Sequence, residues 1–155
     1  STALDFDSST AGIIGTTTNN NADAGSVGEY VSDLVDVSVA VSLTTATSAD
    51  IGSVTLTAGD WDVSGMVGLT PAATTNVDKV FGWSNATSVT LPASYWYSKL
   101  QNPSGGEVPA STFAFNIPTR RYSLSGATTI YLGIRANFSV STMSGYGGII
   151  ARRVR

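Results

Sequence analysis

The stretch from Val54 to Leu69 constrains the fold most, because apolar and polar side chains alternate along it with a period of two. A turn at Ala58-Gly59-Asp60 divides it. The apolar positions are Val54, Leu56 and Ala58 before the turn and Trp61, Val63, Gly65, Val67 and Leu69 after it. Successive side chains of a strand point to opposite faces, so the pattern predicts two strands that each bury one face. We expect Trp61 to be buried in the middle of a β-sandwich, and Asp60, Asp62, Ser64 and Met66 to face solvent or a neighbouring subunit.

Similar runs recur between turns rich in Gly, Asn, Pro and Thr, and the sequence contains no amphipathic helical pattern of any length. The predicted strands lie at Val35 to Leu43, Lys79 to Ser84, Ser88 to Leu91, Thr112 to Ile117, Thr129 to Phe138 and Tyr146 to Arg155, with a short first strand at Ala11 to Thr18. Glu29 to Leu34 fits either a helical turn or a strand, Pro92 to Ala110 is the longest irregular stretch, and Pro118 interrupts a strand. About eight or nine short strands predict an all-β fold, an antiparallel β-sandwich with jelly-roll topology.

The chain has 155 residues, a suitable length for one domain with one hydrophobic core. We expect residues 1–10 to be a leader or linker from an upstream segment and residues 11–155 to form the single domain. Its charges are segregated: residues 1–78 hold ten acidic and no basic residues, whereas residues 79–155 hold all eight basic residues and one acidic residue. If early and late strands lie side by side, this split supplies complementary charges across strands or subunits; chance in a charge-poor chain is the alternative.

The chain contains no histidine and no cysteine, which excludes Ser-His-Asp catalysis, thiolate nucleophiles, disulfides and His- or Cys-ligated metals. Asp60 and Asp62 flank Trp61 and suggest either a carboxylate pair for glycoside hydrolysis or calcium ligands, but turn-forming, solvated carboxylates are the preferred interpretation. No apolar run approaches the roughly 20 residues of a membrane-spanning segment. The expectation is a protein that is not an enzyme. The lack of cysteine favours assembly in a reducing cytoplasm, with a disulfide-free secreted β-domain as the alternative.

Four motifs together resemble a known family: Gly15 to Asn19, Leu56 to Gly65, Pro118 to Arg121 and Gly147 to Arg155. They resemble the C-terminal knob domains of phage tail proteins, in particular the tail needle knobs of short-tailed enterobacterial phages. The resemblance implies a jelly roll like that of tumour necrosis factor and a homotrimer at the tip of an upstream coiled-coil needle. It also implies a virion protein, assembled in the bacterial host cytoplasm, that meets the host envelope during attachment or DNA ejection.

Tyr95, Trp96 and Tyr97, together with Trp83, are candidates for contact with a receptor or glycan. Flat amphipathic rings stack on the apolar faces of sugars while their polar edges donate hydrogen bonds. Aromatic anchors in a subunit interface or in the core explain the same pattern. The alternative function is therefore a carbohydrate-binding module that recognises surface glycans through an aromatic platform.

Arg120, Arg121 and Arg135 are candidates for binding an anion or for a place in a subunit interface, because a guanidinium group matches carboxylate or phosphate. Ion pairs with the Asp-rich first half are the other interpretation. No cofactor or metal is expected, except a small carboxylate or other anion held between subunits. The terminal Arg152, Arg153 and Arg155 do not indicate nucleic acid, because no aromatic residues are interleaved with them. Tyr146 to Ala151 and Trp61 to Leu69 are the strands expected to face a neighbouring subunit.

Overall fold

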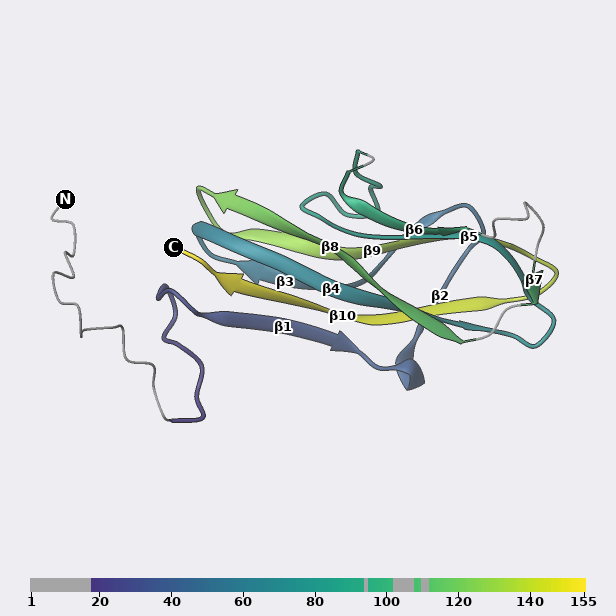
Figure 1. Ribbon diagram of the computed structural model, residues 1–155, viewed down its shortest axis with the longest axis horizontal. Helices are drawn as coiled ribbons and strands as arrows, with labels where there is room; N and C mark the ends of the chain where they lie inside the picture. The colour runs from purple at the N-terminus through teal and green to yellow at the C-terminus, as the bar shows by residue number, and fades with distance from the viewer. Residues whose placement is uncertain (1–17, 94, 102–107, 110–111) are drawn as a thin grey trace, which may run out of the picture.

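The computed structural model describes residues 18–93, 95–101, 108–109 and 112–155, and these residues form two antiparallel β-sheets packed face to face (Figure 1). The predicted leader at 1–10 and most of the predicted first strand at 11–18 lie outside the described residues. In Figure 1 the strands run along the long axis of the molecule, and the C-terminus lies at the same end as the start of β1. No helix among the described residues is long and apolar enough to cross a membrane.

Sheet A has the order β1-β10-β4-β8, with β2 also paired to β10, and sheet B has the order β3-β9-β5-β6, with β7 also paired to β5. The strands of sheet A are β1 (Tyr30–Val35), β2 (Val41–Ser42), β4 (Gly59–Pro71), β8 (Phe113–Leu124) and β10 (Met143–Arg153). The strands of sheet B are β3 (Ser48–Leu56), β5 (Asn76–Asn85), β6 (Tyr97–Gln101), β7 (Val108–Pro109) and β9 (Thr128–Ser139). This order is that of a jelly roll, in which strands distant in the sequence become neighbours, so the predicted all-β sandwich is confirmed.

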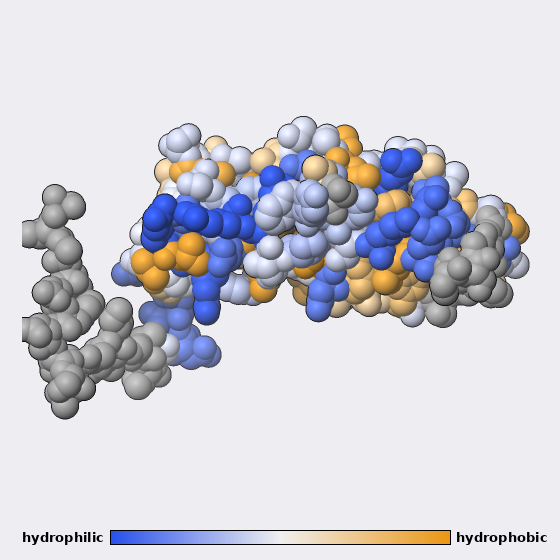
Figure 2. Space-filling model, turned by 45° about the horizontal axis from the view of Figure 1, so that its top comes forward, coloured by the Kyte–Doolittle hydropathy of each residue, from blue (hydrophilic) through white to orange (hydrophobic). Residues whose placement is uncertain are grey.

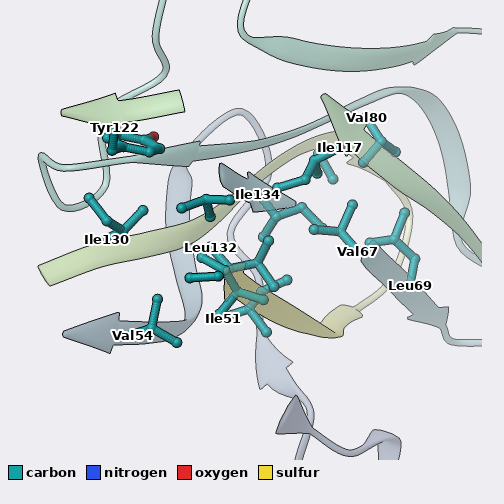
Figure 3. Packing of buried hydrophobic residues seen from close by; sticks show 14 of the residues in the cluster. Ile51, Val54, Val67, Leu69, Val80, Ile117, Tyr122, Ile130, Leu132 and Ile134 are labelled. Atoms are coloured by element: carbon teal, nitrogen blue, oxygen red, sulfur yellow. The ribbon is translucent and has the colours of Figure 1, made fainter. Parts of the chain in front are cut away.

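The core lies between the sheets, where the inward faces of the long strands meet (Figure 3). Trp61 is fully buried, as expected, and its indole Nε1 donates a hydrogen bond of 2.9 Å to the Thr57 carbonyl. Figure 3 shows Val67 from sheet A and Leu132 and Ile134 from sheet B within one cluster. A buried polar contact joins the two sheets, because the hydroxyl groups of Ser84 on β5 and Tyr122 on β8 lie 3.0 Å apart.

The turn at Ala58-Gly59-Asp60 is a corner between the two sheets, because β3 belongs to sheet B and β4 to sheet A. The two strands that it joins therefore pack face to face and do not pair as a hairpin. Gly59 has φ of +135°, and the Arg153 guanidinium occupies the space that a Cβ atom would need there. Glycine is the residue that adopts this conformation without strain and leaves the room.

One predicted strand is only partly right, since Val35 belongs to β1 and Val41–Ser42 to β2, and a second is wrong. The alternating run Val35 to Leu43 breaks after β1, because the Asp36 side chain accepts a 2.9 Å hydrogen bond from Ser38 N and caps the short 3-10 turn η1 (Val37–Val39). Val37 and Val39 are exposed, so the period of two continues in the sequence where the strand does not. Ser88 to Leu91 forms a turn, with Val89 at a φ of +47°.

Pro118 does not end its strand. β8 is the outermost strand of sheet A, and its register against β4 shifts between the Val63–Arg120 and Gly65–Ile117 pairs. An edge strand with a bulge tolerates the missing N–H of a proline. The ambiguous segment before Val35 is strand β1, and the predicted final strand is β10, in the middle of sheet A between β1 and β4. Pro92 to Ala110, predicted as irregular, contains β6 and β7.

Candidate functional site

The outer face of sheet A, on the side away from the core, carries small and apolar side chains on its central strands. Met66 and Ile150 are each almost two-fifths exposed there, and Tyr30 and Leu34 on β1 are more exposed still. The Tyr146 ring lies over Gly68, in the space that a Cβ atom at that position would occupy. A face built in this way is flat and has few long polar side chains.

Two shallow depressions mark this face. The first, of about 440 Å³, is lined by Ser64, Gly65, Met66, Asn116, Ile117, Thr119, Gly148 and Ile150. The second, of about 310 Å³, is lined by Tyr30, Asp62, Ser64, Ile150, Ala151 and Arg152. Both include Ile150 and Ser64, so they adjoin across the centre of the sheet. Asp62, Ser64 and Met66 lie on the side of β4 away from the core, as the sequence predicts.

Asp60 is the exception, because it is buried beneath two arginines. Its Oδ2 accepts a hydrogen bond of 2.7 Å from Arg121 and a second one from Arg155. The Ser123 hydroxyl, followed by the Arg121 and Arg155 guanidinium groups, lowers the pKa of Asp60 to about 2. Arg121 thus forms the internal ion pair with the acidic half of the chain, and Asp60 is not a solvated carboxylate.

A buried arginine joins the two ends of the domain beside this pair. Arg153 donates to Glu29 at 2.9 Å and to the Ala58 carbonyl at 2.8 Å, and its guanidinium lies 4.4 Å from the centre of the Trp61 ring. The hydrogen bond from Gly25 N, followed by that from Arg153, lowers the pKa of Glu29. The Arg153–Glu29 pair confirms that the charge split supplies cross-strand complementarity, and the cluster is structural because its polar groups are directed at one another.

The edge formed by β6 and β8 holds a second exposed surface, which we call the aromatic edge and define by Tyr95, Trp96 and Arg120. Tyr95 is 84% exposed and Trp96 39% exposed. The Arg120 guanidinium lies between two rings, 5.1 Å from the centre of Trp96 and 4.8 Å from that of Tyr122. Stacking on both sides fixes the guanidinium and supports one face of the Trp96 ring. Figure 2 views the molecule from the side where β6 lies in Figure 1, and shows hydrophobic patches separated by hydrophilic ones.

Trp83 cannot contact a glycan, because it has no exposed surface. Its neighbours Gly82 and Ser84 point into the core, so its own side chain lies on the outer face of sheet B, against Gly133 of β9. The chain leaves β5 at Asn85, reaches Asp50 on β3, and returns at Tyr97 beside Trp83. Asp50 accepts hydrogen bonds from Ser88 Oγ at 2.6 Å and from Val89 N at 3.0 Å. Residues 86–93, which we call the covering segment, therefore cross the outer face of sheet B and cover Trp83. Periodicity alone does not reveal this arrangement.

Tyr97 and Arg135 lie on this same outer face. The Tyr97 ring meets the Phe81 ring edge to face, with centroids 5.3 Å apart. Arg135 is directly opposite Phe81 in the β9–β5 register. The structure thus places the seven candidate residues in four settings. Trp83 is buried, and Arg121 is paired with Asp60. Tyr95, Trp96 and Arg120 lie at the aromatic edge, and Tyr97 and Arg135 lie on the outer face of sheet B. Lys79, Lys99 and Phe81 complete this face and were not singled out from the sequence, because cross-strand register decides which residues adjoin.

No group of three or more carboxylates within the described ranges is placed to hold a metal ion. Asp60 is buried and engaged by Arg121 and Arg155, whereas Asp62 is exposed, so the two carboxylates lie in different surroundings. No protein-family profile matches the sequence, and no curated protein matches it.

Proposed function

We propose that this chain is a non-enzymatic virion structural protein, the trimeric distal knob of a phage tail needle or fibre. In this role it follows an upstream coiled-coil segment and contacts the host envelope during attachment or DNA ejection. The observation that carries the proposal is the flat, apolar outer face of sheet A. An exposed apolar surface of this kind marks a protein interface more often than a solvated one.

A ring of three copies needs two different, complementary surfaces on each subunit, because its contacts are heterologous. The outer face of sheet A and the aromatic edge are two such surfaces on adjacent sides of the sandwich. Tyr95 and Trp96 project from the aromatic edge, whereas the outer face of sheet A has a shallow depression beside Met66 and Ile150. Aromatic residues that enter shallow apolar depressions are the usual anchors of protein interfaces.

The size of the face approaches that of one side of a standard interface. Three strands of eleven to thirteen residues and one of six span on the order of 600 Å², at roughly 3.3 Å per residue and 4.8 Å between strands. A standard interface buries about 800 Å² on each partner. The outer face of sheet A therefore supplies about three-quarters of one partner's share of a standard interface.

Analytical ultracentrifugation at micromolar concentration tests the trimer. We expect a species of three times the 16.0 kDa chain mass. Ile150→Asp places a carboxylate in the apolar contact and should weaken association by at least roughly tenfold for each contact. Val140→Asp is the matched control, because Val140 is 74% exposed at the β9–β10 turn. A wild-type monomer, or equal effects of the two variants, would contradict the proposal.

The second candidate function is a carbohydrate-binding module that uses the aromatic edge. The open face of Trp96, supported from behind by Arg120, favours it. Binding to an array of bacterial surface glycans that is lost in Trp96→Ala, with unchanged folding, would support this function. Loss of the trimer in the same variant would instead assign Trp96 to the subunit contact.

A further inference from the structure

The outer face of sheet B gathers three of the eight basic residues of the chain around one aromatic ring. Phe81 on β5 is directly opposite Arg135 on β9 and Lys99 on β6. Lys79 lies two residues before Phe81 and therefore on the same face, roughly 7 Å along the strand. Because cross-strand neighbours lie within reach of long side chains, the three cations can converge on one small ligand.

The aromatic part of this face lies beside the cations. Lys99 Nζ is 5.7 Å from the centre of the Phe81 ring, and the Tyr97 ring packs edge to face against the same ring. Neither Phe81 nor Tyr97 is fully buried. The segment that covers Trp83 borders this surface, since Trp83 is paired with Tyr97 in the register of β5 and β6.

Among the described residues, Arg135 and Lys99 lack the carboxylate partner that Arg121, Arg153 and Arg155 have. Lys79 contacts Asp78 at 3.2 Å, and the Asp50 carboxylate is occupied by Ser88 and Val89. In the described part of the chain, no carboxylate lies within ion-pair distance of Arg135 or Lys99. Arg135 Nε and, two residues along the same face, Asn137 Oδ1 are both buried and have no hydrogen-bond partner among the described residues. Both atoms are shielded from solvent, so a ligand on this face would meet the remaining N–H groups of Arg135 and the amide nitrogen of Asn137.

We propose that the outer face of sheet B binds an acidic saccharide. Arg135 and Lys99 pair with its carboxylate, Lys79 and Asn137 contact its hydroxyl groups, and its ring packs on Tyr97 and the edge of Phe81. A carboxylate matches the fork of a guanidinium, and a sugar ring offers both the apolar face and the hydroxyl groups that the remaining residues accommodate. This inference rests on the proposed function only in assigning the saccharide to the host envelope.

Titration of the full chain with trigalacturonate, followed by NMR of the arginine Nε–H and backbone amides, tests the proposal. We expect saturable shifts at Arg135 and along β5, β6 and β9, and an affinity that falls as salt concentration rises. Arg135→Gln should weaken binding roughly tenfold or more, because a hydrogen bond to a charged group is lost. Arg135→Lys should recover part of the loss, since the charge returns without the fork.

Arg155→Gln is the matched control, because it removes the same charge from an exposed arginine outside this face and should leave the affinity unchanged. Neutral galactotriose should bind far more weakly than trigalacturonate. Equal binding of the two sugars, equal binding of inorganic phosphate at these residues, or an unchanged affinity in a folded Arg135→Gln protein would overturn the proposal. Sedimentation of the same sample reports the trimer independently, so failure of saccharide binding and failure of the trimer are separate results.

Discussion

The two outer faces of the sandwich differ in what covers them and in which side chains they expose. On sheet A, Tyr146 lies flat over Gly68, and the exposed centre is the apolar surface around Met66 and Ile150. On sheet B, a segment of the chain crosses the face, buries Trp83, and leaves a basic surface around Phe81. A face that the chain covers itself needs no partner for its large aromatic residue, whereas a bare apolar face does. The difference suggests one face for a subunit and the other for a charged ligand.

The largest expected effect on stability distinguishes the buried Trp83 from the partly exposed Trp96. Trp83→Ala should lower the free energy of unfolding by about 3–5 kcal/mol, because a fully buried ring leaves a cavity. Trp96→Ala should cost only about 1 kcal/mol, because the ring is partly exposed and chiefly loses its contact with Arg120. Urea unfolding of each variant at low protein concentration measures both values. Equal losses would show that Trp83 is not buried by the covering segment.

The flatness of sheet A can be tested at Gly68. Gly68→Ala should cost about 1–3 kcal/mol, because its Cβ atom meets the Tyr146 ring and must displace it. The displaced ring would then project from the face and weaken the proposed trimer, as measured by ultracentrifugation. Gly126→Ala is the control, because nothing lies within 4 Å of its Cβ position, and it should change stability by less than about 1 kcal/mol. A neutral Gly68→Ala would contradict the proposed packing of Tyr146.

The attachment of the covering segment to sheet B depends on Asp50. Asp50→Ala removes the acceptor of Ser88 and Val89 and should cost about 1–2 kcal/mol. Amide exchange at Val89 should accelerate more than exchange in the strands. Asp62→Ala, an exposed change on sheet A, should leave Val89 unaffected. Unchanged exchange at Val89 in the Asp50 variant would show that other contacts hold the segment.

The smallest effect concerns acid stability. Asp60 has a pKa of about 2 in the folded protein, below its value of 3.8 in an unfolded chain. Its contribution is therefore complete above about pH 4 and is lost as the pH falls from there toward 2. Asp60→Asn should reduce stability at neutral pH and flatten the decline between pH 4 and 2, as measured by urea unfolding at several pH values. An equally steep decline in that window would contradict the role of Asp60.

Local periodicity predicted most of the strands, because side chains that alternate on a strand must meet core and solvent in turn. It failed at Val37 and Val39, where the Asp36 cap outweighed a favourable pattern, and at Ser88 to Leu91, where the Asp50 carboxylate holds a turn. It also suggested a platform that included Trp83, because a sequence does not reveal which loop crosses which face. The separation of Asp60 from Asp62 likewise depends on Arg155, which is distant in the sequence.

The sequence by itself determined the all-β class, the burial of Trp61 and the lack of histidine and cysteine chemistry, since these follow from composition and from the period of two. Tertiary structure decided that the corner at Gly59 joins two sheets, that Arg153 and Glu29 meet, and that Arg135 and Lys99 flank Phe81. The physical reason is that jelly-roll winding brings together strands far apart in the chain. Contacts between them depend on sheet order and register, which no local pattern encodes.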